Sequence, residues 1–111
     1  MAAPSGCEAE ARRFFGDLLG LTEVEKPAPL RGRGGVWFSL GAQQLHVGVE
    51  EPFSPAKKSH PALSASAGGI VALAERLAQA GAKVRWDDEL PDRRRFFSED
   101  PWGNRLEMVA G

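Results

Sequence analysis

The segment DPWGNRLE at residues 100–107 decides how the chain ends and which fold it is compatible with. Asp, Pro, Gly and Asn fill four of its first five positions, and each of these residue types favours a tight reversal. A turn over residues 100–104 and a strand from about residue 105 are therefore predicted. Alternation along the strand puts Leu106 and Met108 on one face and Glu107 on the other.

The position of Glu107 allows two interpretations. A carboxylate in the middle of an otherwise apolar terminal strand is either a solvated, outward residue or a ligand for a bound group. Composition alone favours the solvated residue. The rest of the chain bears on this choice through an internal repeat.

The repeat has an offset of about 60 residues. Gly20 and Gly81, each a predicted helix stop, are 61 residues apart, and Leu45-His46-Val47 precedes Leu106-Glu107-Met108 by the same number. Residues 37–39 (Trp-Phe-Ser) and 96–98 (Phe-Phe-Ser) correspond with an offset of 59. His46 and Glu107 are thus predicted to be equivalent, and a pseudo-twofold arrangement of two sheets would bring them into one cleft.

Each half is predicted to contain one helix followed by three strands. Ser5 and Glu8 have the spacing of a capping box before the first helix. A strand is predicted before the second helix, but its counterpart in the first half would fall at about positions −1 to 4, so it is missing or vestigial. The predicted elements are a helix at 6–19, strands at 22–26, 36–40, 43–50 and 60–65, a helix at 69–80, and strands at 83–86, 94–98 and from 105.

Composition limits the class of protein. A chain of 111 residues with 42% hydrophobic residues forms one ordinary globular domain. A net charge of −1 argues against nucleic acid or an anionic membrane as the main partner. Cys7 is the only cysteine, and neither a signal peptide nor a long apolar run is evident. A cytoplasmic protein without a disulfide is expected.

The closing turn and strand resemble the end of the vicinal oxygen chelate superfamily, which includes glyoxalases, bleomycin-resistance proteins and extradiol dioxygenases. Their last module ends in an Asp-Pro-x-Gly turn and a strand Glu that binds a divalent metal. The resemblance implies an α+β domain over residues 1–111. It would contain two βαβββ modules, 1–51 and 59–111, in a curled mixed sheet around a cleft. The lost opening strand of the first module is the departure from this pattern.

The resemblance also implies a divalent metal held by His60, Glu107 and His46. The second module of the superfamily opens with a His followed by an apolar pair, as at residues 60–64, and closes with the strand Glu. His and Glu are common ligands of Zn, Fe, Mn and Ni. Considered alone, each histidine is more often a solvated residue. A further histidine, from the first strand of module one, has no counterpart here.

Substrate contacts are predicted from four residues. Arg95 and Phe97 fall where fosfomycin-resistance and glyoxalase-like proteins contact substrates, and Arg95 would hold an anionic oxygen. Trp37 and Phe38 are predicted to line the cleft with Phe97.

The implied function is metal-dependent chemistry on a small oxygen-bearing molecule, as a lyase, dioxygenase or transferase. The metal would act as a Lewis acid on vicinal oxygens, and alternatively Glu107, the predicted catalytic residue, would leave the metal briefly and move a proton. One alternative is a bleomycin-resistance kind of protein that binds a drug without turnover, and another is a catalytically silent short form. A homodimer is expected, because a missing strand exposes a sheet edge.

Overall fold

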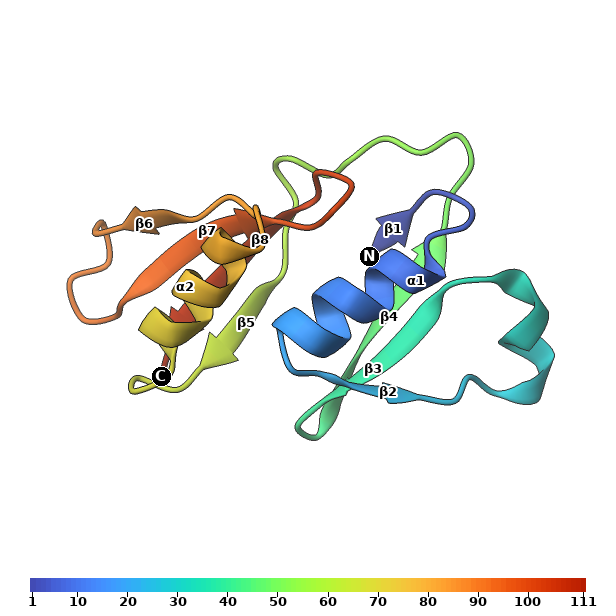
Figure 1. Ribbon diagram of the computed structural model, residues 1–111, viewed down its shortest axis with the longest axis horizontal. Coiled ribbons are helices and arrows are strands. Elements are labelled where there is room, and N and C mark those ends of the chain that lie inside the picture. Colours follow the sequence, from blue (N-terminus) through green and yellow to red (C-terminus); the bar gives the residue numbers. More distant parts are fainter. The chain divides into compact units, whose positions relative to one another are not determined.

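The computed structural model describes all 111 residues, and the chain divides into two compact units. Unit 1 is Met1–Pro55 and unit 2 is Ala56–Gly111 (Figure 1). The division falls in the polar loop that separates the two modules expected from the sequence. No helix in the chain is both long and apolar enough to cross a membrane.

Unit 1 forms a four-stranded mixed sheet in the order β1-β4-β3-β2. Strand β1 runs parallel to β4, and the other pairs are antiparallel. The elements are β1 (Ala2–Ala3), helix α1 (Glu8–Ala11), π-helix η1 (Arg12–Leu18), β2 (Thr22–Val24), 3-10 helix η2 (Ala28–Arg33), β3 (Val36–Leu40) and β4 (Gln43–Val49). An opening strand is therefore present over two residues, and it is not missing.

Helix α1 continues into η1, which buries two adjacent phenylalanines. Phe14 and Phe15 are at most 4% exposed, and the Phe15 ring lies 5.8 Å from that of Phe38 on β3. Each buried aromatic side chain of this size contributes about 1.5–3 kcal/mol by leaving water. This aromatic cluster holds the helix on the sheet.

The predicted capping box does not form. Cys7 is the N-cap and makes no side-chain cap. The Oε2 atom of Glu8 instead accepts the Gly35 N–H at 2.7 Å, which lowers the pKa of Glu8, and the Ser5 N–H donates to Glu51. Gly35 has φ +86°, and a Cβ there would collide with the carbonyl of Val47. The Glu8 carboxylate and the Ser5 N–H, which would pair with each other in a capping box, are therefore bonded to residues distant in sequence.

Unit 2 repeats the same topology in the order β5-β8-β7-β6. Strand β5 is parallel to β8, and the other pairs are antiparallel. The elements are β5 (Ala62–Ala65), helix α2 (Ile70–Gln79), β6 (Arg85–Asp87), β7 (Arg95–Glu99) and β8 (Arg105–Ala110). The predicted α+β fold of two βαβββ modules is confirmed.

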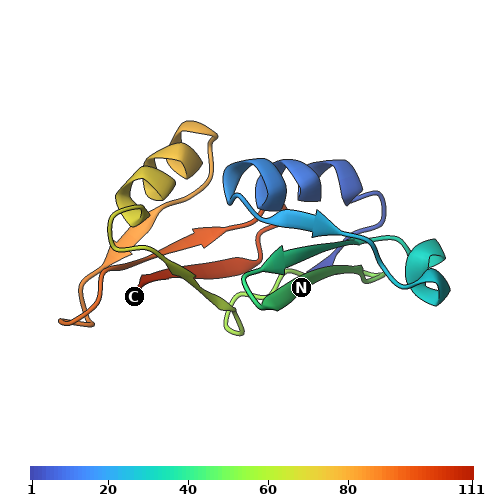
Figure 2. The same ribbon diagram turned by 90° about the horizontal axis from the view of Figure 1, so that it is seen from below.

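The two faces of the second sheet have different roles. Helix α2 lies across one face (Figures 1 and 2) and buries Ile70 and Leu77, while Phe96 and Met108 of that face are at most 2% exposed. Alternation then places Glu107 on the opposite face, where no helix of this unit covers it. Polar chemistry is therefore available on one side of a sheet whose other side is core.

The turn between β7 and β8 forms as the sequence predicts. The Asp100 carboxylate accepts the backbone N–H groups of Trp102 at 3.0 Å and Asn104 at 2.8 Å, and the Asn104 side-chain amide at 2.7 Å. Gly103, at φ 91°, supplies the left-handed residue. Asn104 in turn accepts the Ala56 N–H at 2.9 Å. A single buried carboxylate thus organises the turn that aims β8.

Replacing Asp100 with Asn is expected to destabilise the protein by about 1.5–3 kcal/mol near neutral pH, because one charge-assisted hydrogen bond is lost. Burial raises the pKa of Asp100 above its ordinary value. A raised folded-state pKa contributes stability that is complete below the unfolded pKa and is lost as pH rises through the folded pKa. The loss caused by Asp100→Asn should therefore grow as the solution is acidified.

Urea unfolding of both proteins at about pH 3.5 and about pH 7 would measure this difference. Equal differences in the free energy of unfolding at the two pH values would contradict the assignment of Asp100 as a group with a raised pKa.

Candidate functional site

Four polar side chains form a continuous chain of contacts across the open face of unit 2. His60 Nε2 lies 3.0 Å from Glu107 Oε1, and Arg95 Nη1 donates to Glu107 Oε2 at 3.2 Å. Arg95 Nε also donates to Asp87 Oδ2 at 2.8 Å. These side chains are only 12–22% exposed. We call His60, Glu107, Arg95 and Asp87 the polar relay.

Strand register brings the relay together. Glu107 on β8 pairs with Ala62 of β5, two residues after His60, and Arg95 on β7 pairs with Asp87 of β6. Glu107, Arg95 and Asp87 therefore come from neighbouring strands of one sheet, and His60 from the segment just before β5. The structure brings His60, Glu107 and Arg95 together within unit 2. Sequence reasoning missed Asp87 because it assigned residue 87 to a loop.

The hydrogen bonds of His60 indicate which of its ring nitrogens carries the proton and which has a free lone pair. Nδ1 lies 2.9 Å from the Lys58 carbonyl oxygen, which can only accept, so Nδ1 carries the proton. Nε2 then faces a carboxylate oxygen of Glu107, and two acceptors at that distance need a shared proton or cation. At the other end of the relay, the hydrogen bond from Arg95 lowers the pKa of Asp87.

The His60–Glu107 pair fits two adjacent positions around a divalent metal ion. Ligand atoms at about 2.0–2.2 Å from one ion, at right angles, are about 3 Å apart, and Nε2 and Oε1 are separated by 3.0 Å. A ligating histidine usually donates its other N–H to a carbonyl, as His60 does to Lys58. Neither unit contains a group of three or more His, Cys, Asp or Glu residues suited to hold a metal.

His46 and Trp37 form a separate cluster in unit 1. Their rings stack with centroids 3.5 Å apart and planes at 3°. His46 Nε2 lies 2.9 Å from the side-chain oxygen of Gln44. His46 is exposed, and no carboxylate contacts it within unit 1. Its proposed role as a metal ligand thus stays a prediction, as does substrate contact by Trp37.

Phe38 requires a correction. It is 0% exposed and packs on Phe15 under the helix, so it cannot line a cleft. Trp37 pairs with His46 as Phe97 pairs with Glu107, so Trp37 is equivalent to Phe97. The offset of 59 matched Trp37 with Phe96, which is one residue away from its structural equivalent, Phe97. A shift of one residue moves a side chain to the opposite face.

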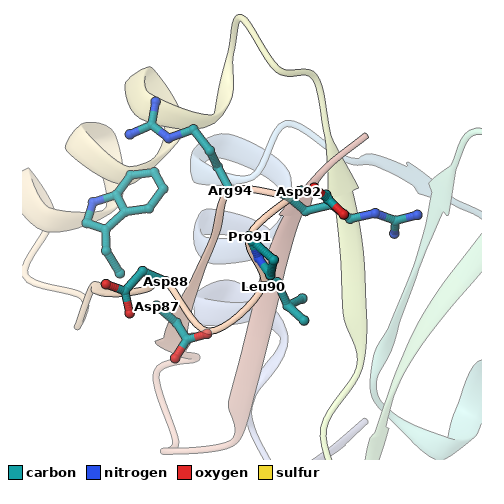
Figure 3. A pocket seen from close by; sticks show the side chains of 8 residues that line it. Asp87, Asp88, Leu90, Pro91, Asp92 and Arg94 are labelled. Carbon is teal, nitrogen blue, oxygen red and sulfur yellow. The ribbon is translucent and has the colours of Figure 1, made fainter.

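A hollow of about 530 Å³ lies at the β6–β7 connection (Figure 3). Two residues that line the hollow, Arg94 and Trp86, are in contact, with the central guanidinium carbon of Arg94 4.8 Å from the Trp86 ring centroid. The lining residues are Trp86, Asp87, Asp88, Leu90, Pro91, Asp92, Arg93 and Arg94. Of the relay, only Asp87 lines this hollow, so it does not include His60 or Glu107.

No protein-family model matches the sequence, and no curated protein matches it. Solved structures do match. A glyoxalase family protein from Bacillus anthracis superposes with a TM-score of 0.92 and 44% identity, over 99% of this chain and 88% of that one. The chain therefore belongs to the glyoxalase family, within the vicinal oxygen chelate superfamily.

More distant structures show the fold alone. Lactoylglutathione lyase from Agrobacterium tumefaciens gives a TM-score of 0.73 at 19% identity, over 100% of this chain and 90% of that one. The fosfomycin resistance protein FosX from Mesorhizobium loti gives 0.73 at 16% identity, over 99% and 86%.

Proposed function

We propose that this protein is a metal-dependent enzyme acting on a small oxygen-bearing molecule, with His60 and Glu107 as metal ligands. The separation of 3.0 Å between His60 Nε2 and Glu107 Oε1, with His60 Nδ1 anchored on a carbonyl, is the observation that carries the proposal. Membership of the glyoxalase family supports it.

A divalent ion bound there would supply Lewis-acid polarisation of vicinal oxygens. The residues of the chain perform the positioning. The Lys58 carbonyl fixes the orientation of the His60 ring, and Arg95 holds one oxygen of Glu107 so that the other faces His60. As an alternative to staying on the metal, Glu107 is proposed to accept or return a substrate proton at Oε1, because that oxygen is not bound by Arg95.

Metal loading tests the proposal. The purified protein is incubated with Zn²⁺, Mn²⁺, Fe²⁺ or Ni²⁺, desalted and analysed for bound metal. About one ion per chain is expected in the wild type for at least one metal, with little in His60→Ala. Equal stoichiometry in both proteins would overturn the site, while metal binding without turnover on any small-molecule panel would favour the silent form.

One observation favours the second candidate, a protein that binds a small molecule without turnover. In the relay, Arg95 already contacts two carboxylates, so the charge of Glu107 is compensated without a metal. For this candidate, aromatic ligands are expected to raise the melting temperature of metal-free protein, with Trp37 of unit 1 and Phe97 of unit 2 as separate candidate contacts. A shift that needs added metal would exclude it.

A homodimer is also proposed. Residues 1–3 hydrogen-bond the outer edge of β4 only from His46 to Glu50, so the part of that edge before His46 has no strand beside it within unit 1. Unpaired edges are sites of association. Sedimentation at micromolar concentration is expected to show a dimer, and a monomer would contradict this expectation.

A further inference from the structure

A second concave site lies on the same face of unit 2 as the relay. It is a pocket of about 350 Å³ and collects positively charged side chains from three separate stretches of the sequence. We call it the basic pocket. Its lining residues are Lys57, Lys83, Arg85, Phe97, Ser98, Glu99 and Arg105. The volume falls in the range of small-ligand sites, about 300–1,000 Å³.

The charges of the basic pocket do not balance. It has four cationic side chains and one carboxylate, that of Glu99. Glu99 lies 3.5 Å from Lys57 and 3.6 Å from Lys83, so it is shared between the two lysines. Arg85 and Arg105 have no carboxylate oxygen within 4.0 Å. Two guanidinium groups are therefore left to bind an anion supplied from outside.

Phe97 holds these guanidinium groups in place. The central carbon of Arg105 lies 4.2 Å from the Phe97 ring centroid, and those of Arg85 and of the relay residue Arg95 each lie 5.1 Å from it. Stacking on an aromatic ring limits the freedom of an arginine side chain while its planar fork of donors remains available. Such forks bind oxyanions through paired, charge-assisted hydrogen bonds. The pocket is thus preorganised for an oxyanion.

The basic pocket adjoins the His60–Glu107 pair. Phe97 pairs with Glu107 on one side of its strand and with Arg85 on the other. The His60 ring meets Phe97 edge-on, with centroids 5.7 Å apart. Neighbouring strands are about 4.8 Å apart, so an anion bound by Arg85 and Arg105 lies about 5–10 Å from the Glu107 carboxylate. One small molecule can span both sites.

We infer that the substrate carries a multiply charged, phosphate-like oxyanion that Arg85 and Arg105 bind in the basic pocket, beside the oxygens that react at His60 and Glu107. An excess of three positive charges over the single carboxylate favours a dianion over a monoanionic carboxylate. This inference rests on the proposed function and specifies the class of substrate for it.

Inorganic phosphate is the probe, titrated into metal-free protein at constant ionic strength and followed by NMR. The wild type is expected to bind phosphate at least about tenfold more tightly than acetate. Arg85→Ala and Arg105→Ala should each weaken phosphate binding at least about fivefold, and Glu99→Gln should strengthen it. Arg105→Lys, which keeps the charge but loses the fork, should give an intermediate loss.

Lys58→Ala and Arg93→Ala are the matched controls, because each removes a cation near in sequence to the pocket residues but outside its lining. Both should bind phosphate as the wild type does. Equal binding of phosphate and acetate, or unchanged binding by both arginine variants, would overturn the inference. Tighter binding of a single-stranded oligonucleotide than of phosphate would replace the small-molecule assignment with a nucleic-acid one.

The use of metal-free protein separates this test from the metal-loading test. If the wild type binds phosphate but retains no metal, the proposed function is contradicted and the basic pocket remains an anion site. If the wild type binds metal but shows no preference for phosphate over acetate, the proposed function is supported and the inference about the basic pocket is overturned.

Discussion

Glu107→Gln is expected to lower the affinity for divalent metal by at least about 100-fold, since the loss of a partner that only orients a ligand already costs about 10–100-fold. Glutamine keeps the size of Glu107 and one acceptor oxygen, so the sheet should remain folded. It removes the negative charge that faces His60 Nε2 at 3.0 Å. Calorimetric titration of the two proteins with the metal that the wild type retains would measure the effect.

Glu99→Gln is the control for this measurement. Glu99 lies on the neighbouring strand of the same sheet, but it pairs with Lys57 and Lys83 rather than with the relay. Its replacement changes the same net charge and should leave metal affinity within about twofold of the wild type. If both variants lose affinity to the same extent, the effect comes from the general field of the protein, and Glu107 is not a ligand.

Phe38→Ala should destabilise the protein by about 3–5 kcal/mol, the usual cost of removing a fully buried phenylalanine. Trp37→Ala, one residue earlier, should cost under about 1.5 kcal/mol, because Trp37 lies on the open face against His46 and not in the core. The adjacent pair thus separates packing from ligand contact. Urea unfolding gives the first quantity, and ligand binding by the folded Trp37→Ala variant gives the second.

The opposite ranking would show that the strand is out of register. If Trp37→Ala proved the more destabilising variant, β3 would be turned over relative to β4, and the equivalence of Trp37 with Phe97 would fail.

The sequence predicts the architecture well because its signals are local and periodic. Strand β3 begins and ends at the predicted residues 36 and 40. The turn at 100–104 is specified by residues within it, because Asp100 accepts its backbone N–H groups and Gly103 adopts its positive φ. The same reasoning placed Phe38 on the wrong face, since adjacent aromatic residues match the repeat equally well at either register, and only the ladder pairing distinguishes them.

The candidate site was only partly accessible from sequence. His60 and Glu107 were found because each matches a motif of a known superfamily. Asp87 and Arg85 were not, because their roles depend on which residues of β7 they pair with. No local pattern states that an arginine on one strand will stack on an aromatic ring of the next. Such contacts require the three-dimensional register.

The short strand β1 is also expected to affect how unit 1 closes during folding and how fast its amide hydrogens exchange. Each unit closes by pairing its first strand with its last, across 46 residues for Ala2 and Gly48 and across 45 for Ala62 and Glu107. Contacts this distant in sequence form slowly, after the local hairpins. Because β1 offers only two residues to this closure, the amide hydrogens of Gly48 and Glu50, bonded to Met1 and Ala3, should exchange with solvent well before that of Glu107. Unit 1 is therefore expected to open first at β1, which pairs with the strand that carries His46.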